Sequence, residues 1–154
     1  ILRSKYSTLN IIILKPAKEF GRNMPADSAI QYVSFSLAEE TYAYEVKLVR
    51  EIITYREPTP VPGSNPEIAG ILNVRGEIVP VLSAEKHIQV STAEAHQRIL
   101  ILDSSRGAAG IAVEHVGEIF LVEPSKINIE ADSSKNVVGT VLHRDNLVIL
   151  LEGL

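Results

Sequence analysis

Apolar residues recur at every second position in short runs from residue 30 onward, and this period restricts the fold more than any other feature. In QYVSFSL (31–37), Val33, Phe35 and Leu37 share one face of an extended strand. Turn residues separate the runs, and the main helical signal is a single turn starting at Asn65-Pro66. Further strands are predicted at 42–49, 51–55, 71–74, 77–82, 98–102, 109–114, 117–122, 138–142 and 146–151. The pattern therefore predicts an all-β protein built as small barrels or as a sandwich.

The chain also contains an internal repeat. Three segments recur in the same order, at offsets of 67, 69 and 66 residues. The pairs are VREII (49–53) with VGEIF (116–120), GILNVRGEIVPVL (70–82) with GTVLHRDNLVILL (139–151), and QYVSF (31–35) with QRILI (97–101). The repeat predicts two similar β-units at about 30–90 and 96–154. A unit of roughly 60 residues is only marginally stable alone, so the two are expected to pack on each other.

The first residues differ from the rest in charge. Residues 1–29 contain five basic and two acidic side chains, whereas residues 30–154 contain 10 basic and 17 acidic ones. The main domain is therefore placed at 30–154, after an N-terminal extension of unknown role at 1–29. No apolar run approaches the roughly 20 residues of a membrane span, so no membrane insertion is predicted.

An arginine interrupts the longest apolar run, GILNVRGEIVPVL. Arg75 and Gly76 fall between two strand patterns, and Arg144 and Asp145 occupy the equivalent place in the repeat. Glycine readily adopts the positive φ that a tight hairpin turn requires. Both segments are therefore predicted to be hairpin tips, from which Arg75 projects without being buried.

The patterns of common catalytic and metal sites are absent from the sequence. Without cysteine there is no thiolate nucleophile or zinc–thiolate site, and the four histidines show no metal-ligand spacing. No G-x-S-x-G motif occurs, and RGAAG at 106–110 lacks the Lys-Ser/Thr of a phosphate loop and is predicted to be a hairpin turn. No catalytic residue, cofactor or metal ion is predicted. A hydrolase whose carboxylate pair forms only in the fold remains an alternative.

Nucleic-acid binding by a small barrel is a second alternative. Such barrels combine a basic groove with stacking aromatic residues. This chain has a net charge of −4, and its five Tyr and three Phe lie mainly at core positions of the strand pattern. A binding module for other proteins is therefore favoured, and nucleic acid is not expected as a partner.

Several of these segments together resemble the CheW-like family, the coupling proteins of bacterial chemotaxis-type signalling. The resemblance covers about 30–151 and rests on V-x-E-I, P-T-P-V-P and G-x-x-N-x-R-G-x-x-x-P-V in order, followed by NVVGTVLHRDNLVILL. It implies two small five-stranded barrels, SH3-like or OB-like, around a shared hydrophobic core. It also implies a cytoplasmic, non-catalytic adaptor between a chemoreceptor's cytoplasmic tip and the regulatory domain of a CheA-type histidine kinase.

The family's partner-contact positions transfer to particular residues here. In V-x-E-I, Val49 and Glu51 are implicated in kinase contact, and Arg75 is a second contact position. The predicted partner-binding residues are Val49, Glu51, Gly70, Arg75 and Gly76. Each also has a purely structural interpretation: Val49 as a core residue, the glycines as backbone requirements, and the two charged residues as solvated side chains.

The sequence departs from the family in places. Ser83 stands where an aspartate is common, and the extension at 1–29 matches nothing in the family. N-x-R-G with Val74 at x also occurs in adaptors for surface-pilus motility, so a pilus or other chemosensory-like pathway is an alternative. Exposed barrel edges make self-association a further possibility.

Overall fold

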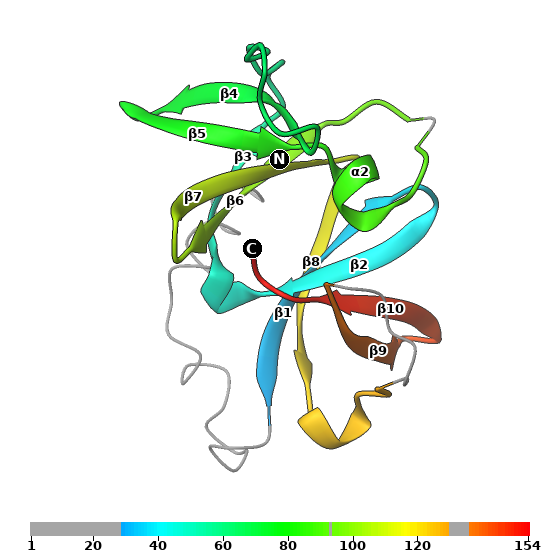
Figure 1. Cartoon of the computed structure of the whole chain (residues 1–154). Coiled ribbons are helices and arrows are strands. Elements are labelled where there is room, and N and C mark those ends of the chain that lie inside the picture. Colours follow the sequence, from blue (N-terminus) through cyan, green and yellow to red (C-terminus); the bar gives the residue numbers. More distant parts are fainter. Residues whose placement is uncertain (1–28, 93, 130–135) are drawn as a thin grey trace.

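A computed structural model of the chain describes residues 29–92, 94–129 and 136–154 and is built almost entirely of strands (Figure 1). The elements are β1 (Ile30–Leu37), β2 (Glu40–Glu45), η2 (Val46–Leu48), β3 (Val49–Thr54), β4 (Ile68–Val74), β5 (Glu77–Leu82), α2 (Ala84–Ile88), β6 (Arg98–Ser104), β7 (Gly107–Val113), β8 (His115–Val122), η3 (Pro124–Lys126), β9 (Val137–His143) and β10 (Asn146–Leu151). The predicted all-β class is confirmed. Apart from Ala29, the predicted N-terminal extension lies outside the described residues. Among the helices of the described ranges, none has the length and apolarity to cross a membrane.

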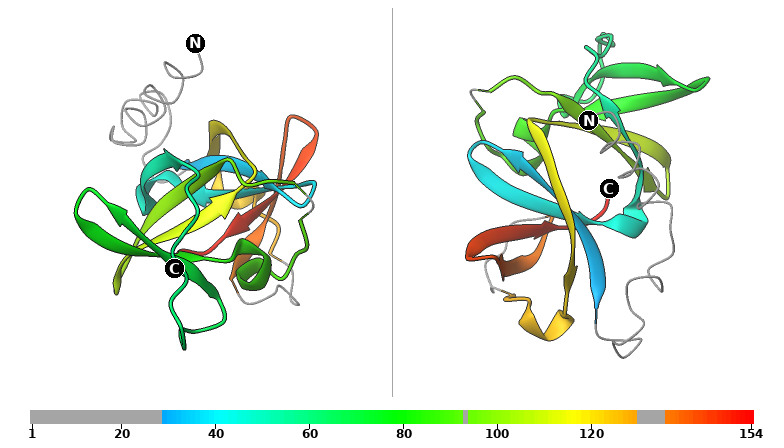
Figure 2. Two further views of the ribbon diagram at one scale, coloured as in Figure 1. Left: turned by 90° about the horizontal axis from the view of Figure 1, so that it is seen from above. Right: turned by 180° about the vertical axis from the view of Figure 1, so that it is seen from behind.

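The strands form two five-stranded sheets, which are the two SH3-like subdomains of the fold (Figures 1 and 2). One sheet has the order β3-β6-β7-β5-β4 and comes from one continuous stretch of chain, so we call it the continuous subdomain. The other has the order β8-β1-β2-β10-β9 and joins the first two strands to the last three, so we call it the composite subdomain. Each sheet contains one parallel pair, β5 with β7 and β10 with β2.

The internal repeat is confirmed by the topology. Replacing β3, β4, β5, β6 and β7 by β8, β9, β10, β1 and β2 converts one sheet order into the other. Even the isolated bridges correspond, because Thr59 pairs with Ile71 in one subdomain and Asn128 pairs with Thr140 in the other. The weak sequence matches therefore mark strands that occupy equivalent places.

The structure changes two details of the predicted repeat. The sheets do not follow the units of about 30–90 and 96–154, because β1 and β2 complete the sheet of β8–β10. The alignment of 31–35 with 97–101 is also wrong by one residue. Val33 pairs with Ile119, and Leu100 pairs with Ile52. Because Ile119 and Ile52 are equivalent in the repeat, Val33 is the equivalent of Leu100. Two glutamines at 31 and 97 favoured the wrong register, whereas strand pairing fixes which side chains face inward.

The buried apolar side chains of the two sheets form three clusters. The largest lies between the sheets and draws on both of them; it includes Val33, Phe35, Leu37, Tyr42, Tyr44, Val49, Ile52, Leu100, Leu102, Ile111 and Val113. Within it, the ring of Phe35 stacks on those of Tyr42 and Tyr44, with centroids 5.8 and 5.6 Å apart. The other two clusters fill the two subdomains separately. The predicted shared core is therefore confirmed.

Three local predictions are corrected. The strand predicted at 42–49 breaks at η2, where the chain crosses between the sheets while Val46 and Val49 both stay in the shared core. Asn65 begins a hydrogen-bonded turn, and the short helix occurs instead at α2, where Ser83 accepts a hydrogen bond from the backbone N–H of Lys86. The turn predicted over 106–110 is confined to 105–106, because β7 already begins at 107. Ser83 stands where the family commonly has an aspartate, and both residue types cap helix N-termini, so this difference is compatible with the start of α2 at Ala84.

The Tyr44 hydroxyl gives a test of the shared core. It is fully buried and has no hydrogen-bond partner among the described residues. An unpaired buried hydroxyl costs about 1–3 kcal/mol. We therefore expect Tyr44→Phe to raise the free energy of unfolding at pH 7 by about 1 kcal/mol, measured by urea denaturation. A loss of stability would contradict the assignment of this hydroxyl as unpaired.

The same variant changes the response to alkaline pH. Burial raises the pKa of Tyr44, and burial followed by the charge of Glu45 raises the pKa of Tyr32 to about 12. The folded protein thus holds these protons more tightly than the unfolded chain, whose tyrosines titrate near pH 10. The contribution of these tyrosines to the free energy of unfolding is therefore fully present below about pH 10 and is lost as the pH rises toward 12. Tyr44→Phe is expected to make this decline shallower.

Candidate partner-binding surface

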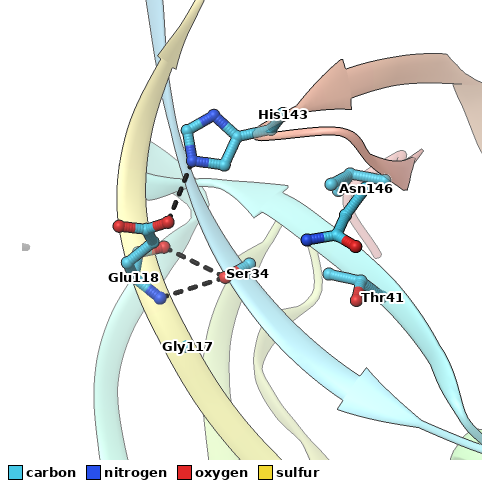
Figure 3. Close-up of a pocket in the computed structure, with 7 residues that line it drawn as sticks. Ser34, Thr41, Gly117, Glu118, His143 and Asn146 are labelled. Atoms are coloured by element: carbon cyan, nitrogen blue, oxygen red, sulfur yellow. Dashed lines mark hydrogen bonds and ion pairs between the residues drawn. The ribbon is translucent and has the colours of Figure 1, made fainter.

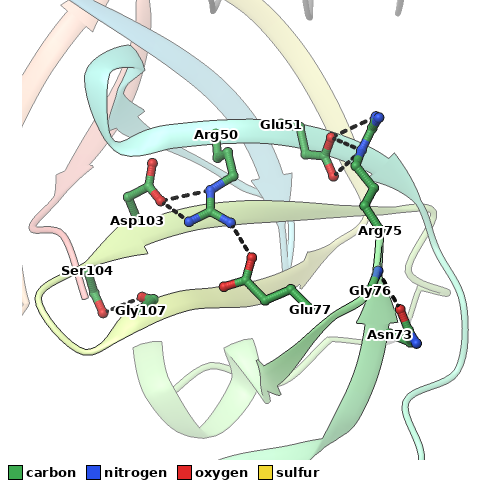
Figure 4. Close-up of polar contacts among 9 residues, drawn as sticks. All are labelled: Arg50, Glu51, Asn73, Arg75, Gly76, Glu77, Asp103, Ser104 and Gly107. Atoms are coloured by element: carbon green, nitrogen blue, oxygen red, sulfur yellow. Dashed lines mark hydrogen bonds and ion pairs between the residues drawn. The ribbon is translucent and has the colours of Figure 1, made fainter.

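A β-bulge in β3 sets the geometry of the exposed end of the continuous subdomain. Val49 pairs with Leu102 and Glu51 with Ile101, so Arg50 is an extra residue in the ladder. A bulge redirects the side chains next to it. Here Arg50 and Glu51 both engage charged partners at the same end of the sheet (Figure 4).

The β4–β5 hairpin tip lies beside this bulge, and its predicted position is confirmed. Arg75 and Gly76 are its two turn residues, with φ of 52° and 87°, as in a type I′ turn. The Asn73 side-chain oxygen accepts a hydrogen bond of 2.9 Å from the Gly76 N–H and stabilises the turn. The tip therefore holds the Arg75 backbone in place beside β3.

Arg75 reaches from the tip to Glu51. Its Nε and Nη2 both lie 3.0 Å from Glu51 Oε2. The Arg75 side chain is 80% exposed, whereas that of Glu51 is 14% exposed. The arginine within the apolar run is thus not buried: it lies over a carboxylate of the neighbouring strand.

A second ion pair network runs alongside the first. Arg50 makes bonds of 2.8 and 2.6 Å from Nε and Nη2 to Asp103, and one of 2.7 Å from Nη1 to Glu77 (Figure 4). Hydrogen bonds to Asp103 and then Glu77 raise the pKa of the already basic Arg50. We call Arg50, Glu51, Arg75, Glu77 and Asp103 the tip cluster. The sequence reasoning missed Arg50, Glu77 and Asp103, because they meet only through strand pairing and the bulge.

An exposed apolar side chain adjoins the tip cluster. Ile78 is 59% exposed, while Val79 and Val81 point into the subdomain and are buried. Strand alternation in EIVPVL already placed Ile78 on the outer face, so this signal was available in the sequence. An exposed isoleucine next to Glu77 in the chain is a combination that suits protein binding, where apolar contact and charge complementarity act together.

The five predicted partner-binding residues fall into two groups. Glu51, Arg75 and Gly76 lie together at the exposed tip. Val49 is buried in the shared core. Gly70 is also buried, and a Cβ there would lie 2.5 Å from the Thr59 carbonyl oxygen. Val49 and Gly70 are therefore packed inside the domain, and direct partner contact stays a prediction for the residues at the tip.

Metal chemistry has no visible basis in the part of the chain that the structure describes. No group of three or more His, Asp or Glu residues there is arranged to hold a metal ion. The tip cluster places charged side chains, most of them at least 40% exposed, on a hairpin and a bulge. Such an arrangement is suited to binding another protein.

The domain defined by this fold and surface is an all-β module with two SH3-like subdomains. A family model described as the CheW-like domain matches residues 31–153. The chain therefore belongs to the CheW-like domain family.

Individual relatives agree with this assignment. The chemotaxis protein CheW of Treponema pallidum is 26% identical over 137 residues, covering 82% of this chain and 81% of that protein. Chemotaxis protein CheW of Bacillus subtilis is 25% identical and covers 78% of this chain and 81% of its own length. Among solved structures, the scaffolding protein TtCheW from Thermoanaerobacter tengcongensis aligns with a TM-score of 0.73 at 27% identity, covering 80% of this chain and 88% of that one.

The close backbone approach at Gly70 leads to a prediction. We expect Gly70→Ala to lower the free energy of unfolding by about 2 kcal/mol, because its methyl group would push the Thr59 backbone away from β4. Gly76→Asn is the matched control: position 76 has open space and asparagine tolerates its positive φ, so the loss should stay below about 1 kcal/mol. Urea denaturation measures both, and equal losses would contradict a packing role for Gly70.

The exposed ion pair leads to a second prediction. Because Arg75 is 80% exposed, its attraction to Glu51 is screened by water. A double-mutant cycle with Arg75→Ala and Glu51→Ala should give a coupling energy below about 1 kcal/mol for folding. A coupling above about 2 kcal/mol would mean that the pair holds the fold and is not free to exchange partners.

Proposed function

We propose that this protein is a non-catalytic chemotaxis adaptor that binds the regulatory domain of a CheA-type histidine kinase through the tip cluster. The observation that carries this proposal is the placement of Glu51 and Arg75. The family resemblance implied partner contact at both positions, and here they form one ion pair between the hairpin tip and the bulge, with the Arg75 side chain 80% exposed. Their low expected contribution to folding leaves them available for binding.

The names of the relatives support the chemotaxis role. Similar proteins are called chemotaxis protein CheW, and the similar solved structure is called a scaffolding protein. An adaptor that holds two partners at once raises the effective concentration of each for the other. We infer that the second partner is the cytoplasmic tip of a methyl-accepting chemoreceptor, which would place the adaptor in the cytoplasm.

Binding at the tip cluster would exchange one set of ion pairs for another. A partner carboxylate can take Arg75 from Glu51, and a partner cation can then pair with Glu51. Ile78 supplies apolar area beside these charges. Attraction between such charged patches speeds association, so binding should weaken as salt concentration rises.

The signalling pathway that the adaptor serves is not decided by how the tip cluster binds its partner. The same adaptor role in pilus motility or in another chemosensory-like pathway would use the same tip cluster. Val74 within N-x-R-G, which suits both, is buried inside the continuous subdomain. It therefore bears on packing and does not favour either pathway.

Titration with the kinase regulatory domain from the same source tests the proposal. We expect micromolar binding by the parent chain and a loss of tenfold or more, about 1.4 kcal/mol or above, for Arg75→Ala and for Glu51→Ala. Arg144→Ala is the matched control, since Arg144 is 75% exposed, sits at the equivalent tip of the composite subdomain, and pairs with Glu118. Thermal melts verify that each variant is folded.

Two results would contradict the proposal. One is the absence of binding by a folded parent chain. The other is an equal loss for Arg75→Ala and Arg144→Ala, which would show a general charge effect in place of a specific surface.

A further inference from the structure

The composite subdomain has a pocket at its open end, on a different part of the molecule from the tip cluster. Its volume is about 330 Å³, which is at the lower end of the range for small-ligand sites. Five strands contribute to its lining, with Ser34, Thr41, Gly117, Glu118, His143 and Asn146 around it (Figure 3). Thr41 and Asn146 lie on one side, and Glu118 and His143 on the other.

The internal repeat shows what fills the same place in the other subdomain. By strand pairing, Gly117 is the equivalent of Arg50, and Asn146 is the equivalent of Glu77. In the continuous subdomain the Arg50 guanidinium binds Glu77 at 2.7 Å and Asp103 at 2.6 and 2.8 Å; the equivalent of Asp103 is Ser36. In the composite subdomain glycine has no side chain to place there. The pocket therefore borders the place in which its counterpart holds its own guanidinium group.

The backbone around Gly117 is built to keep this space. The Ser34 hydroxyl accepts a hydrogen bond of 3.0 Å from the Glu118 N–H and donates one of 3.2 Å to the Glu118 carbonyl oxygen. A Cβ at Gly117 would lie 2.4 Å from Ser34 Oγ, so a side chain is excluded while this arrangement holds. The equivalent of Ser34 is Ile101, which is buried and apolar. The composite subdomain thus has a polar serine where the continuous subdomain has a buried isoleucine.

The remaining polar groups are suited to a hydrogen-bond donor. The Thr41 hydroxyl and the Asn146 amide form no hydrogen bond with any residue of the described ranges. Across the pocket, the Glu118 carboxylate contacts His143 Nε2 at 2.9 Å and the exposed Arg144 Nη1 at 3.4 Å. Two neutral oxygens therefore face one carboxylate, whose Oε1 contacts His143 and whose Oε2 is weakly held by Arg144 from the solvent side.

We propose that this pocket binds a guanidinium group, supplied by free arginine or by an arginine side chain of a partner protein. The planar fork of donors would reach Glu118 on one wall and the Asn146 and Thr41 oxygens on the other. Residues 30–154 carry 10 basic and 17 acidic side chains, which favours a cationic ligand. Because Asn146 and Ser36 replace the carboxylates of Glu77 and Asp103, the carboxylate of Glu118 is the one full charge that holds the group, and an isolated probe binds in the millimolar range.

An NMR titration with N-acetyl-arginine amide tests the inference. The Gly117 backbone amide and the Asn146 side-chain amide should shift saturably, and N-acetyl-lysine amide should bind at least fivefold more weakly. Thr41→Val should weaken arginine binding about threefold to tenfold by removing one acceptor. Asn146→Glu, which restores the carboxylate of the continuous subdomain, should tighten it about tenfold.

Controls separate a site from a general charge effect. Ser105→Glu adds the same charge at an exposed turn of the continuous subdomain and should leave the affinity unchanged. Asn146→Asp replaces Asn146→Glu if the longer side chain disturbs the fold, which the dispersion of the amide spectrum reveals.

The outcomes decide the inference directly. It is overturned if neither the parent nor a folded carboxylate variant shows saturable shifts at 100 mM probe, if lysine binds as well as arginine, or if Ser105→Glu tightens binding equally. Both sources of the ligand are compatible with it: a tenfold preference for free arginine over N-acetyl-arginine amide indicates the free amino acid, and equal or tighter binding of the amide indicates a partner's side chain.

Discussion

The apolar cluster between the two sheets is the interaction on which the rest of this structure depends. Each sheet of five strands is too small to form a stable domain alone, and the cluster gives both a second buried face. Its central aromatic side chains, Phe35, Tyr42 and Tyr44, come from the two strands that complete the composite subdomain. These strands, β1 and β2, are the first of the described chain, and their sheet is completed by the last three strands, β8 to β10. The cluster therefore also joins the two ends of the domain.

This core fixes one backbone plan that the chain uses twice for different purposes. In both subdomains a bulge places a glutamate beside the arginine of a hairpin tip: Glu51 with Arg75, and Glu118 with Arg144. The difference lies one residue earlier, where Arg50 in one bulge is matched by Gly117 in the other. A charged and filled surface results in the first case, and an open polar pocket in the second. The two ends of the molecule are thus equivalent in backbone and different in chemistry.

Much of this arrangement was predictable from the sequence, because strand alternation and turn chemistry are local. The hairpin tips at Arg75 and Arg144 follow from glycine, aspartate and asparagine placed between apolar runs. What escaped prediction depends on long-range pairing. The bulge at Arg50, its bonds to Asp103 and the sharing of strands between the sheets are decided by which strands meet. The sequence left Val49 open between a core residue and a contact residue, since an alternating pattern does not tell which of two faces is covered.

Hydrogen–deuterium exchange of the chain, alone and with the kinase regulatory domain, tests the central claim that the tip cluster is the kinase-binding surface. The claim predicts slower exchange on complex formation at 50–54 and 73–79, with the equivalent tip at 142–147 unchanged. Protection confined to regions outside 50–54 and 73–79 would contradict it, and would mean that the exposed Glu51–Arg75 pair is a solvated surface feature without a role in binding.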